Sequence, residues 1–348
     1  MSGLSGAEIK VAAKKASTWG TAVVCGANNG IVILPANIKR DAPIDIDDSM
    51  GNLFSKYGTQ GPLKVEGDIP LYLRYDGLDM LLAMYMGTAG APTLQGSGAY
   101  ANTYKVKTLL DGLFFTYIKN MKNYIDEYGS VKITGIIIKS EVGKALQVSL
   151  QVICQNKVVS STTNTTSTFA NVTWFEEQNR VRFSEGVFRM NTQSGGALSG
   201  GDTVYPSAFE FTSKRKMAGA YSGQYLSALG QELIDEPLGD GTMESTLKLT
   251  FPRHTSSSSI SDLVTDARKK MDITFTGALI GGSYYRQFKL QYPHLQLKNV
   301  DPVDVQGNIK EPLEFIVHGC ASAPTGMTGL TDPFWISVIN RLSTDPLA

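Results

Sequence analysis

The chain has 348 residues, and its 32 Lys and Arg balance 32 Asp and Glu, so the formal net charge is zero. A neutral chain offers no field that would gather nucleic acid or an anionic membrane, which excludes tight binding to either. The three cysteines, Cys25, Cys154 and Cys320, lie too far apart for a zinc knuckle or a disulfide framework. No apolar run approaches the ~20 residues of a membrane helix, so we expect a soluble protein made in the cytoplasm.

The clearest local pattern is alternation, which predicts strands. In residues 63–75 apolar side chains occupy odd positions and mostly polar ones the even positions. Residues 145–152 alternate in the same way, and their second face is polar but uncharged. Both stretches have the period of a half-buried strand, and a composition with 35 glycines and many Thr, Ser and Val also favours β structure.

Two helices are predicted, each directly after a strand. Asp76 is a suitable N-cap for a helix over residues 77–86, which has an apolar stripe and ends at Gly87. Ser259 or Ser261 opens a second predicted helix that continues to residue 271. Its last turn is basic, which suits the helix dipole, through Arg268, Lys269 and Lys270.

The order strand, helix, strand, hairpin occurs twice along the chain. The predicted hairpins pair residues 131–139 with 146–154, and residues 295–303 with 313–320. We therefore expect an all-β fold with minor helix, made of two tandem β domains with one flanking helix each. The expected boundaries are 1–155 for the first domain, 156–171 for a linker, and 172–348 for the second domain, with an insertion at about 185–235.

Motifs for chemistry are weak. Residues 23–30, VVCGANNG, look like the phosphate turn of a dehydrogenase, but Pro35 prevents the helix that such a turn needs, so a plain turn is favoured. The histidines do not have metal-ligand spacing, since tens of residues separate several of them: His254, His294 and His318. An enzyme would depend on generic carboxylates such as Glu176. We expect no catalytic residue, no cofactor and no metal.

Residues 14–23, KKASTWGTAV, resemble the N-terminal signature of the tail tube proteins of long-tailed bacteriophages: a small residue, then Thr, Trp, Gly and Thr. The resemblance is best over residues 10–155. It implies tail-tube-like β-sandwich or barrel domains and a structural subunit of the virion tail, not an enzyme. Six such domains form a ring in this family, so a two-domain chain is expected as a trimer with a pseudo-hexameric ring.

The resemblance also implies partners. Rings of this chain would stack on one another by self-assembly into a hollow, DNA-conducting tube. A tape-measure protein would occupy the tube during assembly, and tail terminator and baseplate proteins would contact its ends. DNA would be present only in transit during ejection, without tight binding.

A tube that conducts DNA must not retain it, because each lysine or arginine on a phosphate adds affinity. We therefore expect the lumen-facing surface to include Glu66, Asp68, Gln147, Ser149 and Gln151. The same alternation also suits a face that is merely solvated.

An early aromatic residue beside two lysines is typical of a buried interface. We expect an inter-ring contact at Lys14, Lys15, Thr18 and Trp19. The alternative is that Trp19 packs on its own domain. A second function is also open: a β-sandwich binding module of a virion, for carbohydrate or receptor binding or head decoration, with stacking surfaces at Tyr205, Tyr221 and Tyr225.

Overall fold

The computed structural model describes residues 6, 9–46, 54, 57–88, 90–174, 179–228, 230–254, 256–300, 303–305 and 308–348. Within these residues the protein is mostly antiparallel β structure, which confirms the predicted fold class in its coarse form. The helices are short: α1 (Asp79–Met86), α2 (Thr166–Phe169) and α3 (Ser258–Val264).

A first set of six strands pairs side by side across the N-terminal half. Their spatial order is β1 (Lys10–Ala16), β9 (Phe114–Asn120), β10 (Ile125–Glu141), β11 (Gln147–Cys154), β6 (Lys64–Tyr72) and β3 (Asn37–Asp41). All neighbours are antiparallel. The hairpin of β10 and β11 is the one that alternation predicts.

A second set of six strands has the same order. It consists of β13 (Gly186–Thr192), β21 (Lys269–Gly281), β22 (Tyr284–Val300), β24 (Asn308–His318), β20 (Glu244–Phe251) and β15 (Ala208–Lys214). Every neighbouring pair is again antiparallel. The segment 185–235, expected as an insertion, thus contributes β13 and β15 to this set of strands.

The two sets form one sheet because β10 pairs with β15 as well as with β9 and β11. Short strands extend it: β2 (Gly30–Ile31), β12 (Lys157–Val159), β14 (Thr203–Val204), β23 (Val303–Val305), β25 (Trp335–Asn340), β8 (Ala99–Lys105) and β7 (Thr93–Gly96). The pairings branch but do not return to their starting strand, so among the described residues the sheet is open. The barrel alternative is therefore wrong.

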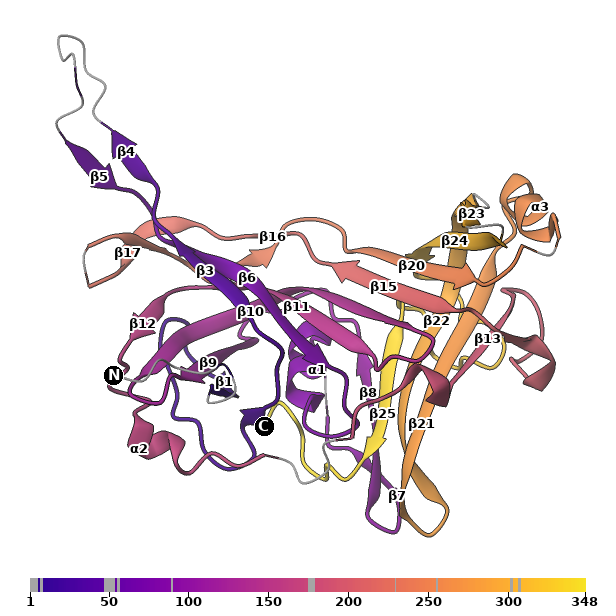
Figure 1. Ribbon diagram of the computed structural model, residues 1–348, viewed down its shortest axis with the longest axis horizontal. Helices are drawn as coiled ribbons and strands as arrows, with labels where there is room; N and C mark the ends of the chain where they lie inside the picture. Colours follow the sequence, from indigo (N-terminus) through magenta and orange to yellow (C-terminus); the bar gives the residue numbers. More distant parts are fainter. Residues whose placement is uncertain are drawn as a thin grey trace.

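One apolar core lies under both strand sets, because alternate side chains of each strand point inward. Helix α1 lies beneath β10 (Figure 1) and is buried at all but one of its eight positions. Tyr85 of α1 donates a hydrogen bond of 2.6 Å to Ser213 of β15. This core cluster, the largest of three among the described residues, contains residues of both strand sets. The expected domain boundaries stay a prediction.

The first predicted helix is confirmed, and Gly87 ends it in the left-handed conformation at φ 91°. Its predicted N-cap is wrong: the helix begins at Asp79 after Leu78, and the Asp76 carboxylate instead pairs with Arg286 at 2.9 Å. The second predicted helix is wrong in its extent, because α3 ends at Val264 and Lys269 and Lys270 begin β21. Burial explains the difference: Lys270 reaches inward and donates to the carbonyls of Gly195 and Thr325, at 2.7 and 3.0 Å.

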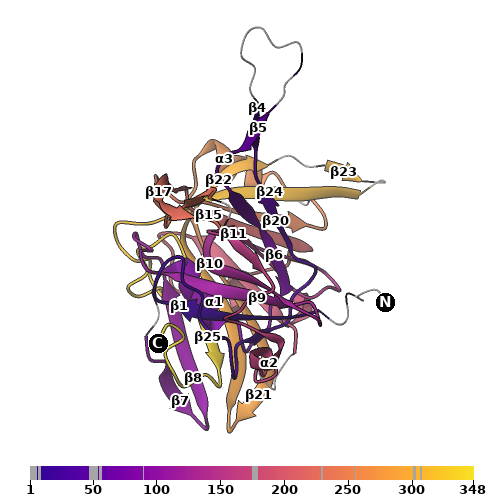
Figure 2. The same ribbon diagram turned by 90° about the vertical axis from the view of Figure 1, so that its left-hand side faces the viewer.

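Three two-stranded ribbons lie outside the main sheet: β4 (Ile44–Ile46) with β5 (Gly58–Gln60), β16 (Met217–Ala218) with β19 (Leu238–Gly239), and β17 (Tyr221–Leu226) with β18 (Glu232–Ile234). The ribbon of β4 and β5 continues from β3 and β6 and projects far from the body (Figures 1 and 2). The predicted turn after Cys25 is present, with the Asn29 amide donating to the Gly26 carbonyl at 3.3 Å, but residues 21–25 form no strand.

Candidate assembly surfaces

One face of the sheet carries all five residues predicted to line a bore: Glu66, Asp68, Gln147, Ser149 and Gln151. In the register of β6 and β11, Gln151 lies opposite Asp68, so both side chains point to the same side. The other three residues lie at alternate positions along these strands and therefore share that side. The intervening residues of β11 are buried in the core. We call this side the polar sheet face.

The polar sheet face continues across the strands that follow. One row of directly opposed residues crosses β11, β10, β15, β20 and β24: Gln147, Lys139, Glu210, Lys248 and Glu314. Lysine and glutamate alternate along it, and the Lys248 ammonium lies 3.8 Å from the Glu314 carboxylate. Each of these lysines therefore has a carboxylate on a neighbouring strand.

Opposite charges also face each other near the ends of the polar sheet face. Lys39 of β3 lies opposite Glu66 of β6, and Lys64 lies opposite Asp41. On the second strand set, Lys214 lies opposite Glu244. Cross-strand neighbours of opposite charge attract and neutralise one another's field. The face is polar, but its cations are matched locally by carboxylates.

Trp19 is 7% exposed and lies inside its own chain. Its indole Nε1 donates to the Ile234 carbonyl at 3.1 Å, and its ring meets Phe114 edge to face with centroids 5.2 Å apart. This packing ties the end of β1 to β18. The observed contacts are those of the alternative in which Trp19 packs on its own chain, whereas an inter-ring role for this turn stays a prediction.

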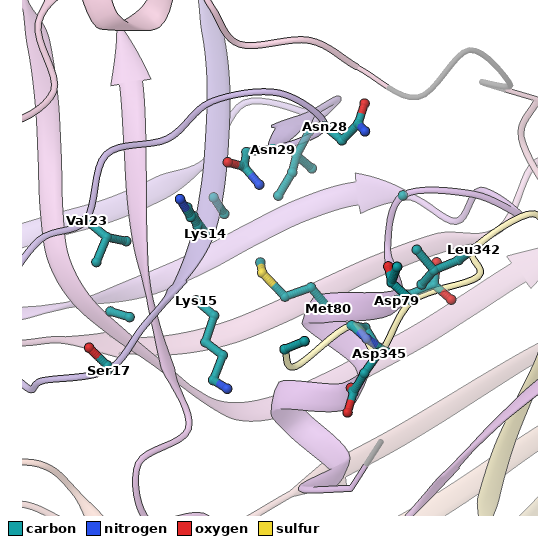
Figure 3. Close-up of a pocket in the computed structure, with 17 residues that line it drawn as sticks. Lys14, Lys15, Ser17, Val23, Asn28, Asn29, Asp79, Met80, Leu342 and Asp345 are labelled. Atoms are coloured by element: carbon teal, nitrogen blue, oxygen red, sulfur yellow. The ribbon is translucent and has the colours of Figure 1, made fainter. Parts of the chain in front are cut away.

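Three more residues of the predicted inter-ring contact lie near Trp19. Thr18 is exposed, and Lys14 donates to the Val24 carbonyl at 3.2 Å. Lys15 donates to the Leu347 carbonyl and so holds the C-terminal segment. Both lysines line a pocket of about 440 Å³ between β1, α1 and the C-terminal segment (Figure 3).

A family model described as phage tail tube protein matches residues 6–317, almost the whole length of the chain. The chain belongs to the phage tail tube protein family. No curated protein matches it. The membership decides between the two functions left open by the sequence, because a tail tube protein is a structural component of the virion tail and not an enzyme.

The cysteine and histidine side chains of this tail tube protein have structural roles in the fold. Burial raises the pKa of the Cys25 thiol to about 12 and also raises that of Cys154, so both stay protonated and unreactive. The His254 ring lies 3.3 Å from the Glu311 carboxylate. The described residues contain no group of three or more His, Cys, Asp or Glu side chains that could hold a metal ion. They also contain no helix that is long and apolar enough to cross a membrane. Glu176 lies outside the described residues.

The tail tube protein has an apolar surface that the sequence reasoning missed. On the projecting ribbon, Ile44 is 64% exposed and Ile46 57% exposed. In the sequence PIDID these isoleucines alternate with aspartates, a pattern that predicts a strand. The pattern does not reveal that the apolar side of this strand lacks a core to pack against. These two isoleucines form a small apolar surface that no described part of the chain buries.

Proposed function

We propose that this tail tube protein assembles as rings of three chains, in which each chain supplies two like modules and the ring has pseudo-sixfold symmetry. The modules are the expected domains at 1–155 and 172–348. Support comes from the strand order, since both six-stranded sets share one order, and from the helices, since α1 and α3 each follow the fifth strand of that order. Two copies of one topology in a chain give a trimer the contacts of a hexamer.

In this proposal the polar sheet face lines the bore of the tube. The main support is that the face spans the strands from β3 to β24 and that its lysines lie opposite carboxylates. An unmatched lysine would release counterions from passing DNA and hold it. A lysine beside a glutamate attracts phosphate far less. The wall is thus hydrated, and close to neutral along its length.

Rings stack on one another to form the tube. The surface around Lys14, Lys15 and Thr18 is the proposed inter-ring contact, with Trp19 as the buried support of that turn. A tape-measure protein fills the bore before DNA enters it, and tail terminator and baseplate proteins contact the tube's ends. These partners rest on the family and not on a contact in the structure.

A charge change at Ser149 tests the assignment of the bore. Ser149 lies between Pro70 and Ile137 on the neighbouring strands, so a lysine there has no carboxylate directly opposite. Assembled S149K tubes should retain a duplex oligonucleotide at least about threefold more tightly than wild type, with a steeper salt dependence. S149E is the matched control and should not retain DNA. Equal retention by all three tubes would remove this face from the bore.

A further inference from the structure

The junction between the two strand sets shows how two like modules of this chain join. Residues 135–141 of β10 extend past β9, and β15 pairs with this free edge in antiparallel register. Gly135, which follows a β-bulge, pairs with Lys214. The last strand of the second set thus adds to the long strand of the first.

The second strand set has the same free edge at the corresponding place. β21 pairs with β22 only as far as Leu295, and β24 covers the other edge of the residues that follow. Asn299 also follows a β-bulge and corresponds to Gly135. Beyond Leu295, no strand within the described part of the chain pairs with the β21 side of β22; α3 lies near β22, and Asp266, just after α3, accepts a side-chain hydrogen bond from Gln296.

The first strand set has the complementary free strand. β3 pairs with β6 on one edge, and no described residue pairs with its other edge. When the two strand sets are compared pair by pair, Lys39 of β3 occupies the position in the first set that Lys214 of β15 occupies in the second. β15 buries Phe209, Phe211 and Ser213 at the junction, whereas no residue of β3 is buried.

Helices α1 and α3 differ in burial in the same way as β15 and β3. Seven residues of α1 are buried, and Tyr85 reaches Ser213 of the added strand β15. α3 occupies the corresponding place in the second set and has no buried residue, and Val264 is 81% exposed. α3 lacks the neighbour that α1 has.

We propose that β3 of one copy adds to the free edge at the end of β22 of a second copy, so that the β10–β15 junction within the chain is repeated between chains. Lys39 of one copy then lies opposite Asn299 of the next, with Ile38 opposite Val300. All four strands keep the polar sheet face on the same side, since Lys39 and Asn299 both belong to it. The added strand covers α3. This contact is head to tail, and it rests on the proposed trimer, whose threefold rotation would close it into a ring.

Cysteine pairs test the contact. Directly opposed residues on antiparallel strands lie close enough for a disulfide. In a C320S background, K39C/N299C should oxidise to covalent dimers and trimers, at least about tenfold above either single variant, with no larger product. L94C/N299C is the matched control, because Leu94 on β7 is exposed but belongs to neither edge, and it should stay monomeric under denaturing conditions.

The possible results distinguish a wrong edge contact from a wrong proposed function. Wild-type rings or tubes in negative stain, together with an uncrosslinked K39C/N299C assembly, would overturn the edge contact and leave the tube intact. Failure of the wild-type chain to form any ring or tube would overturn the proposed function itself. Hydrogen exchange of wild-type protein needs no variant: the amides of residues 37–41 should slow on assembly, and unchanged exchange there would also overturn the contact.

Discussion

Lys132 of β10 and Glu236, just after β18, form an ion pair of 2.6 Å in which the lysine side chain is only 1% exposed. Glu236 also accepts a hydrogen bond from the Gly112 amide at 2.9 Å. E236Q keeps an acceptor for that amide but removes the charge beside a buried ammonium, so we expect a loss of about 2 to 3 kcal/mol in the free energy of unfolding. Urea unfolding of the unassembled chain measures it.

E244Q is the control for this ion pair. Glu244 lies 3.0 Å from Lys216, but both side chains are more than half exposed. Solvent screens such a pair, and its loss should cost less than about 1 kcal/mol. Equal losses for the two variants would mean that burial of Lys132 has no energetic consequence.

Replacing Trp19 by Phe separates its two possible roles. W19F loses the hydrogen bond to Ile234 and keeps an aromatic ring next to Phe114. A buried carbonyl left without its donor should lower the free energy of unfolding by about 1 to 2 kcal/mol. Ring stacking, followed by sedimentation of assembled tubes, should change little. Normal stability with lost stacking would show instead that the indole acts between rings.

Gly67 allows β3 to approach β6 closely. Its φ is 158°, and a Cβ at this position would lie 2.0 Å from the Asn37 carbonyl oxygen. G67A should therefore push β3 away from β6 and weaken ring formation, because the displaced strand is the one proposed to add to the next copy. Light scattering of assembly against protein concentration measures this.

Gly223 provides the comparison for Gly67. Nothing lies within 4 Å of a Cβ placed there. G223A should assemble at the wild-type concentration. Normal assembly of G67A, with its fold intact by circular dichroism, would argue that the position of β3 is unimportant for the ring.

Stability should depend on pH through Asp79. Burial raises the pKa of this carboxyl above its ordinary 3.8, and hydrogen bonds from Tyr104 and Asn340 oppose the shift only in part. The folded chain then binds this proton more tightly than the unfolded chain does. The group's stabilisation is thus present below about pH 3.8 and is lost as pH rises through the folded pKa.

The D79N variant isolates this contribution, because an amide does not titrate. The free energy of unfolding of wild type minus that of D79N should fall as pH rises from about 4. Thermal unfolding of both proteins over a pH series gives the difference. A gap that stays constant or widens with pH would show that Asp79 is charged throughout.

The sequence by itself determined several of the strands, which side of each is buried, and the family. Alternation at Val148, Leu150 and Val152 identified the buried side of β11, because a strand repeats every two residues whatever lies beside it. Gly87 marked the end of α1 for an equally local reason. The signature around Trp19 indicated a tail tube protein, and the family match bears this out.

Tertiary structure alone decided which strand lies beside which. The pairing of β10 with β15 joins residues about 70 positions apart, from Glu141 with Ala208 to Gly135 with Lys214, and an alternating pattern suits any partner of the same polarity. Lys269 and Lys270 resembled the basic end of a helix, yet carbonyls from distant loops hold Lys270 in a strand. Trp19 found its acceptor at Ile234 in the same way. Local periodicity states which side of a strand is buried, whereas its neighbours depend on contacts between segments far apart in the chain.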